Sequence, residues 1–192
     1  MSDKYLVQVL ERNEHFCKMF KLVTMAELPL WLEEANAVID VCIKRHPKHL
    51  YAIYISNNPV DLAKGESRLI QQEAIKKLKG ECSRKGITTS TKAMYLGMGR
   101  SVNTFDFDTK DDADTLRKEV IDILNTKEFS CEYTNTPNGV HVHLKAIDNI
   151  RFMNVLTNYL KSCLDKIGHD VCSPIEGTYK GDFLISKGAT NQ

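Results

Sequence analysis

Two short segments of this chain carry residue types whose spacing could support metal chemistry. Residues 105–108 read Phe-Asp-Phe-Asp, and residues 139–143 read Gly-Val-His-Val-His. Side chains two apart on a strand share a face, so Asp106 and Asp108 are predicted to point in the same direction. Two neighbouring carboxylates repel each other, and a divalent cation such as Mg²⁺ or Mn²⁺ relieves that repulsion. The first segment therefore predicts a metal site on a strand.

The second segment could bring imidazoles to the same place. Asn138-Gly139 is a strong hairpin signal, and it places His141 near the start of the returning strand. Gly139 has no side chain, so the backbone can approach a ligand closely there. The imidazole of His141 could donate to a phosphate or to a polarised oxygen, and His143 shares its face of the strand. The alternative for each is an ordinary core or surface histidine.

Composition places limits on the class of protein. The chain has 192 residues, 42% hydrophobic and 27% charged, which is typical of one globular domain. Its net charge of +1 provides no global attraction to nucleic acid or membrane. A local basic stretch over residues 76–100 precedes an acidic stretch over residues 106–114. The basic stretch is either a solvated surface or a phosphate-binding one.

Cysteine usage and the terminus bear on the compartment. The six cysteines form no Cys-x-x-Cys motif, which argues against a zinc ribbon and against a secreted disulfide scaffold. The first residues lack the features of a signal peptide, and no apolar run approaches the length of a membrane span. We therefore expect no membrane partner and a cytoplasmic location, which could be the cytoplasm of a host.

The first hundred residues are predicted to form an N-terminal α/β module. Apolar periodicity predicts helices over residues 27–45 and 65–79. Between them, the β-branched and aromatic residues 50–56 predict a strand. Residues 86–99 are consistent with a strand or with a polar loop that leads into one. This module occupies residues 1–100.

Residues 101–192 are predicted to form a second module with a regular alternation of elements. The predicted strands cover residues 101–107, 129–134, 140–147 and 182–186, and the predicted helices cover residues 111–127 and 149–167. The order strand, helix, strand, strand, helix, strand is the split βαβ arrangement, an antiparallel sheet with helices on one face. RNA-recognition modules use the same plan. We therefore predict an α+β fold, an RRM-like palm with an N-terminal α/β elaboration, packed together as one domain.

These motifs resemble those of the archaeo-eukaryotic primase superfamily, in particular plasmid and phage primase-polymerases. The family has hydrophobic-Asp-hydrophobic-Asp on one strand, which residues 105–108 match, and a small-x-His motif after a turn, which residues 136–141 match. Lys110, two residues after the second aspartate, fits a pattern of plasmid and phage members. Upstream, residues 51–59 resemble a strand followed by Asn-Pro. The resemblance covers roughly residues 50–185.

The resemblance implies a set of catalytic residues. Asp106 and Asp108 would coordinate Mg²⁺ or Mn²⁺, and His141 would contact the phosphates of the incoming nucleotide. The family's third motif is a hydrophobic residue followed by an acid. Asp170 is the better-placed candidate in chain order, although His169 precedes it, and Asp182 is the alternative. The metal set is then Asp106, Asp108 and Asp170, and His141 completes the catalytic set.

The resemblance also implies an activity and its partners. The activity would be template-directed nucleotidyl transfer with two metal ions, by a DNA primase or polymerase. His141, His143, Lys110 and Arg100 would bind the nucleoside triphosphate. A single-stranded DNA or RNA template would follow the basic stretch of residues 76–100. The chain has no attached helicase, so a separate helicase is a further expected partner.

Two other functions fit parts of the sequence. His141-Val142-His143 resembles the histidine-hydrophobic-histidine motif of rolling-circle replication and relaxase endonucleases. Tyr159 would then be the nucleophile, with Lys161 and Lys166 nearby, but Cys163 breaks the usual Tyr-x-x-x-Lys spacing. That reading also leaves the aspartate pair unexplained. The poor match to the third motif favours another alternative, a catalytically degenerate module that binds nucleic acid or a protein partner.

Overall fold

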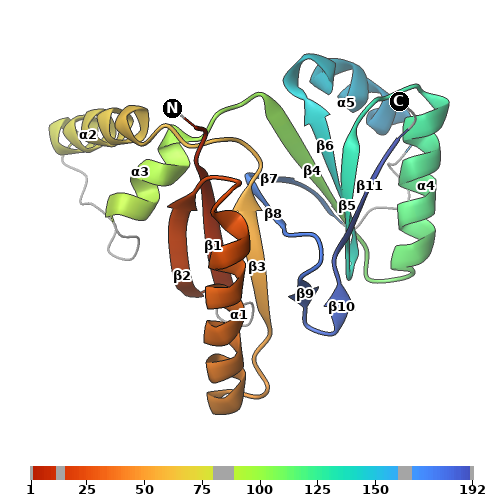
Figure 1. Cartoon of the computed structure of the whole chain (residues 1–192). Coiled ribbons are helices and arrows are strands. Elements are labelled where there is room, and N and C mark those ends of the chain that lie inside the picture. The colour runs from red at the N-terminus through yellow and green to blue at the C-terminus, as the bar shows by residue number, and fades with distance from the viewer. Residues whose placement is uncertain (1, 12–15, 80–88, 160–165, 191–192) are drawn as a thin grey trace.

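The computed structural model describes residues 2–11, 16–79, 89–159 and 166–190, and they form an α+β protein with antiparallel sheets (Figure 1). This confirms the prediction of a mixed helix-and-strand fold with antiparallel sheets. A four-stranded sheet and a five-stranded sheet each carry helices of their own. Among the described residues, no helix combines the length and the apolar character that crossing a bilayer requires.

The four-stranded sheet has the order β2-β1-β3-β8, with every pair antiparallel. Its strands are β1 (Tyr5–Glu11), β2 (Phe16–Val23), β3 (Tyr51–Ser56) and β8 (Cys172–Pro174). Helix α1 (Leu28–Arg45) packs against this sheet, where Trp31 joins Val9 and Ile53 in a buried cluster. The predicted helix and the predicted strand of this region are confirmed.

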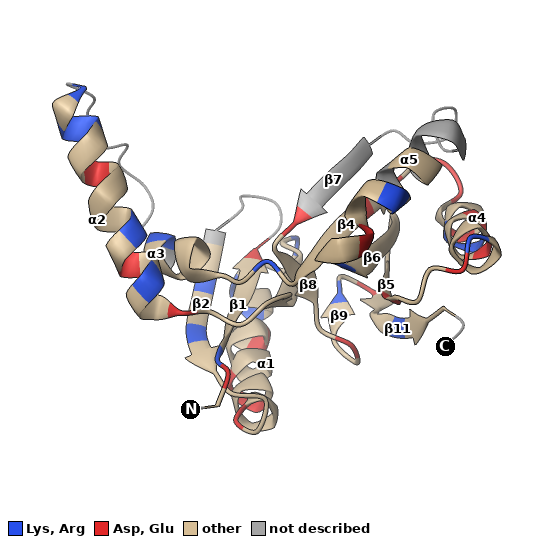
Figure 2. Ribbon diagram, turned by 90° about the horizontal axis from the view of Figure 1, so that it is seen from above, with Lys and Arg blue, Asp and Glu red and all other residues tan. Residues whose placement is uncertain are grey.

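Two further helices extend away from the four-stranded sheet, as Figure 2 shows. They are α2 (Leu62–Leu78) and α3 (Thr89–Gly97). Their backbones meet closely, because a Cβ built on Gly65 would lie 1.9 Å from the carbonyl oxygen of Ala93. The helical prediction for residues 65–79 is confirmed. The prediction of a strand or loop over residues 86–99 is wrong over Thr89–Gly97, since packing on α2 outweighs the β-preference of threonine, and residues 86–88 lie outside the described residues.

The five-stranded sheet has the order β11-β5-β6-β4-β7, again with every pair antiparallel. Its strands are β4 (Val102–Asp108), β5 (Glu132–Thr136), β6 (Gly139–Lys145), β7 (Lys166–Asp170) and β11 (Ser186–Ala189). Helix α4 (Ala113–Thr126) connects β4 to β5, and a 3-10 turn η1 (Ala146–Asp148) leads into α5 (Asn149–Tyr159). A small hairpin of β9 (Tyr179–Lys180) and β10 (Phe183–Leu184) precedes β11.

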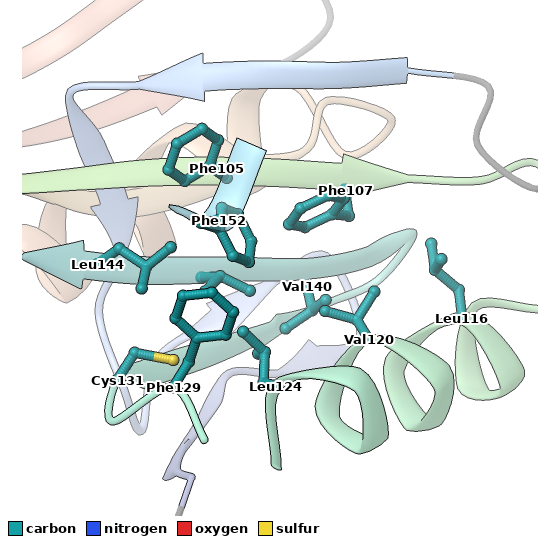
Figure 3. Packing of buried hydrophobic residues seen from close by; sticks show 11 residues of the cluster. Phe105, Phe107, Leu116, Val120, Leu124, Phe129, Cys131, Val140, Leu144 and Phe152 are labelled. Atoms are coloured by element: carbon teal, nitrogen blue, oxygen red, sulfur yellow. The ribbon is translucent and has the colours of Figure 1, made fainter. Parts of the chain in front are cut away.

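The core of the second half lies between this sheet and its helices (Figure 3). Phe105 and Phe107 of β4 pack with Phe152 of α5, at ring-centroid distances of 4.8 and 6.2 Å. Val120 and Leu124 of α4, the other helix that covers this face of the sheet, complete the cluster. Because side chains alternate along a strand, Asp106 and its neighbours on that face point away from this core.

Several boundaries differ from the predictions. The strand predicted over residues 129–134 begins at Glu132, and the strand predicted over residues 140–147 ends at Lys145, because Ala146–Asp148 form η1. The helix predicted to reach Ile167 is wrong at its end, because β7 already occupies Lys166–Asp170. The final strand predicted over residues 182–186 divides into β10 and β11. Strand β8, from the second half of the chain, pairs with β3 of the first half. The two predicted modules, residues 1–100 and 101–192, therefore share a sheet.

Candidate metal centre

Three neighbouring strands bring Asp106, His141 and Asp170 together on the polar face of the five-stranded sheet. Asp106 of β4 is directly opposite His141 of β6 in the register. The Nε2 atom of His141 lies 3.1 Å from Oδ1 of Asp106 and 3.9 Å from Oδ2 of Asp170. One ligand atom from each of the three residues lies within 4.8 Å of the others. The arrangement can hold a metal ion.

A contact from the other sheet orients the imidazole of His141. Its Nδ1 atom lies 3.4 Å from Oγ of Ser173, a buried residue of β8. If Nδ1 carries the proton and donates to this hydroxyl, Nε2 keeps its lone pair toward the two carboxylates. Outer contacts of this kind fix the tautomer of metal-binding histidines. Ser173 therefore positions His141 without belonging to the group of ligands.

The chemistry of these residues fits a divalent cation. The Oδ1 atom of Asp106 is buried and, apart from the neighbouring imidazole, has no hydrogen-bond partner among the described residues. A buried carboxylate oxygen without a donor is costly, and a cation removes that cost. Two carboxylates and one imidazole suit Mn²⁺ well, and the oxygen atoms also suit Mg²⁺. Asp170 is 44% exposed at its side chain, so the centre is open on one side.

The other predicted acids lie elsewhere. Asp108 shares the polar face of β4 with Asp106, but it sits at the end of the strand, opposite Gly139. It does not belong to the group whose ligand atoms lie within 4.8 Å, among the residues that the structure describes. Asp182, the alternative third acid, is exposed in the turn between β9 and β10. Of the two candidates, Asp170 is the one that reaches Asp106 and His141.

His143 forms hydrogen bonds with two threonine hydroxyls instead of facing the acids. Its Nδ1 lies 2.9 Å from Oγ1 of Thr104, and its Nε2 lies 2.8 Å from Oγ1 of Thr134. Burial, with smaller contributions from the neighbouring His141 and from the ammonium group of Lys187, lowers the pKa of His143 to about 3, so it is neutral. It is outside the Asp106–His141–Asp170 group. Hence β6 presents one histidine to the acids and ties the other to threonines.

The residues that the endonuclease reading requires are only partly visible. Tyr159 is the last residue of α5, and nothing is described of its side chain. Lys161 lies outside the described residues, and Lys166 begins β7.

A pocket of about 390 Å³ adjoins the metal centre at Asp170. Two arginines line it, Arg100 from the loop before β4 and Arg68 from α2. The guanidinium of Arg68 is held in place, because its Nη1 donates to the carbonyl oxygen of Leu96 at 2.7 Å. Tyr95 of α3 forms another part of the wall. Lys110, by contrast, is exposed in the loop after β4.

Sequence reasoning missed the residues that support the centre from the first half of the chain. Asn58 is buried and holds the start of β4, since its Oδ1 accepts from the backbone of Val102 at 2.9 Å and its Nδ2 donates to the same residue's carbonyl at 2.7 Å. Asn57 donates to the carbonyl oxygen of Asp170 at 3.1 Å. In the sequence, the Asn-Asn-Pro run after the strand was the signal that could have identified these two asparagines. Arg68 and Ser173 carried none.

The chain matches no protein-family model, no curated protein and no solved structure. Among the described residues, the group formed by Asp106, His141 and Asp170 is the arrangement whose chemistry points to a function.

Proposed function

We propose that this chain performs template-directed nucleotidyl transfer, as a primase-polymerase-like domain of the archaeo-eukaryotic primase type. The observation that carries the proposal is the convergence of Asp106, His141 and Asp170 from three strands of one sheet. The strand order β7-β4-β6-β5, with helices against one face, supports it, because an RRM-like palm requires that order and that sidedness.

The residues around the centre have complementary roles in this proposal. Asp106 and Asp170 hold a divalent cation, with Asp108 at the edge of the site. Such a cation neutralises phosphate charge and lowers the pKa of an attacking hydroxyl. His141 donates from Nε2 to a phosphate oxygen once a nucleotide enters; in that tautomer Nδ1 carries no proton and accepts a hydrogen bond from the hydroxyl of Ser173 instead. Arg68 and Arg100 bind the remaining phosphates, since guanidinium groups pair with phosphate in a bidentate manner.

The template would lie along α2, whose end begins the basic stretch of residues 76–100. The ribbon in Figure 2 marks several lysine and arginine positions along α2, with acidic positions between them, on the helix pair that extends from the sheets. Lys64 and Lys77 are exposed there. Exposed ammonium groups bind a phosphate backbone without regard to base sequence. The pocket with the two arginines lies between this helix pair and the metal centre, which supports a common path for template and nucleotide.

The test is nucleotide incorporation on a primed and an unprimed single-stranded template with Mn²⁺ or Mg²⁺. We expect Asp106→Ala and Asp170→Ala each to reduce incorporation at least a hundredfold, because each removes a metal ligand. The matched control is Asp122→Ala, an exposed aspartate of α4 that should leave incorporation unchanged. No incorporation by the unaltered chain under any of these conditions would refute the polymerase proposal.

Metal titration separates the remaining alternatives. If Asp106→Ala leaves the affinity for Mn²⁺ unchanged, the metal centre itself is wrong, and a non-catalytic binding module is the better description. A covalent adduct between Tyr159 and single-stranded DNA, formed without triphosphates, would instead identify the rolling-circle type of endonuclease.

A further inference from the structure

We propose that a second ligand site, separate from the metal centre, lies between the two sheets and binds a nucleoside monophosphate. A cavity of about 570 Å³ occupies this position. Its walls come from β3, β6, β8 and β11, and they include Ile55, His143, Ser173 and Lys187. None of the three residues of the metal centre lines it. A cavity of this volume is in the usual range for small-molecule sites.

The charges of the lining favour an anion. Lys145 of β6 and Lys187 of β11 both line the cavity, and Glu132 of β5 is the single acid among the lining residues. Neither lysine forms an ion pair with a carboxylate in the part of the chain that the structure describes. Two ammonium groups at one cavity, without an acid bound to either, provide a place for a phosphate.

The rest of the lining favours a ring with hydroxyl groups over a bare phosphate. Tyr5, Ile55 and Val102 supply apolar and aromatic surface against which a planar base can lie. Glu132 can accept hydrogen bonds from ribose hydroxyls or from an exocyclic amine. The imidazole of His143, fixed by two threonine hydroxyls, forms a rigid part of the wall. A nucleoside monophosphate combines the features that this lining would recognise.

Two residues connect this cavity to the metal centre. Ser173 lines the cavity and contacts Nδ1 of His141 at 3.4 Å. Asn57 also lines it, and its side chain donates to the backbone carbonyl of Asp170 at 3.1 Å. A ligand that displaces either residue moves a member of the metal group. Binding in the cavity should therefore change the affinity for Mn²⁺, and Mn²⁺ should change the ligand's affinity by the same factor.

The experiment is calorimetric titration of the full chain with adenosine 5′-monophosphate in the presence of a chelator. We expect binding without metal. Lys145→Ala combined with Lys187→Ala should weaken it at least tenfold and should leave the affinity for Mn²⁺ unchanged. Lys118→Ala, an exposed lysine of α4, is the matched control. Trp31 is buried where α1 packs against the four-stranded sheet, and its fluorescence shows whether each variant is folded.

Further arms make the outcomes distinct. Asp106→Ala should lose Mn²⁺ binding and keep binding of the monophosphate; loss of both would place the ligand at the metal centre and overturn the proposal. Inorganic phosphate should bind more weakly than the monophosphate, and equal affinity would overturn the role of the ring. Ser173→Ala should reduce the coupling to Mn²⁺. The proposal does not rest on nucleotidyl transfer, so an inactive protein that binds the monophosphate would refute only the proposed function.

Discussion

At the scale of single residues, the two histidines of β6 differ because of what surrounds them. His141 faces two carboxylates and a serine, whereas His143 is bonded to Thr104 and Thr134 at both ring nitrogens. Both residues are histidines, and their side chains lie on the same face of β6. Their chemistry is decided by neighbours on other strands, which a pattern of alternation cannot specify.

The neutral state of His143 predicts a dependence of stability on pH. Its pKa falls from 6.5 to about 3 on folding, chiefly through burial, so the unfolded chain binds a proton that the folded chain excludes. Stability is then fully present above the unfolded pKa and is lost as the pH falls toward 3. Between pH 7.5 and 5 the free energy of unfolding should decrease by about 2 kcal/mol from this group.

Urea unfolding of the metal-free chain at each pH measures this change. His143→Asn should have a shallower dependence on pH, although it will be less stable at neutral pH because Thr104 and Thr134 lose a partner. His46→Asn alters an exposed histidine and should keep the slope of the unaltered chain. The same slope in all three proteins would contradict the assignment.

Gly139 is a position where a side chain does not fit. A Cβ there would lie 1.8 Å from the carbonyl oxygen of Phe107, on the neighbouring strand. We expect Gly139→Ala to push β6 away from β4 and to reduce the free energy of unfolding by about 3 kcal/mol. Gly99→Ala is the control, since its Cβ would meet the nearest atom at 3.4 Å, an ordinary contact. Comparable unfolding midpoints for the two variants would refute this prediction.

At the scale of elements, α4 holds the turn between β5 and β6 in place through one side chain, that of Arg117. The guanidinium of Arg117 donates from Nε to the carbonyl oxygen of Gly139 at 3.0 Å and from Nη2 to that of Pro137 at 3.2 Å. It also bonds the carbonyl oxygen of Thr136 and lies over the ring of Phe183, 5.0 Å from its centroid. The turn that precedes His141 is thus fixed by one side chain.

Because Arg117 fixes the turn before His141, its substitution should also affect the metal centre. Arg117→Lys keeps the charge but loses the planar set of donors, and we expect a loss of about 2 kcal/mol in stability. Because the turn sets the position of His141, the affinity for Mn²⁺ should fall as well, by roughly tenfold. Lys118→Ala, at the next and exposed position, should change neither quantity. Stability and Mn²⁺ titrations on the same samples decide the matter.

At the scale of the whole molecule, the two sheets are joined in two ways: a strand from the second half of the chain belongs to the four-stranded sheet, and polar side chains connect the sheets. Strand β8 comes from the second half of the chain and pairs with β3 of the first. Asn58, just after β3, bonds Ser101 and both backbone groups of Val102 at the start of β4. Such contacts make the folding of each sheet depend on the other.

We therefore predict one cooperative unfolding transition. The fluorescence of Trp31, the only tryptophan, reports on the four-stranded sheet, and far-ultraviolet circular dichroism reports on both sheets. The two curves should coincide in urea. Asn58→Ala should shift both by about 2 kcal/mol, since it removes the buried side chain that pairs with the partly buried backbone groups of Val102, whereas the exposed Asn154→Ala should not. Separate transitions would contradict this account of the joined sheets.

Several parts of the fold could be predicted because they depend on local preferences. The hairpin at Asn138-Gly139 follows from turn chemistry, and the stripes of α1 and α4 follow from helical periodicity. The strand that carries Asp106 shows a clear alternation with phenylalanine. β1 gave no such signal, because Gln8 and Glu11 are buried among its apolar residues.

The amino-acid order by itself determined that an acidic strand and a hairpin with histidines exist, since these features act over a few neighbouring residues. Only the tertiary structure decided that Asp170 lies on a strand beside Asp106, and that Ser173 reaches His141 from the other sheet. Residues 166–170 contain a glycine and few strand-forming side chains, so their conformation depends on pairing with β4. Pairing between distant segments is governed by packing across the whole chain, and no local pattern encodes it.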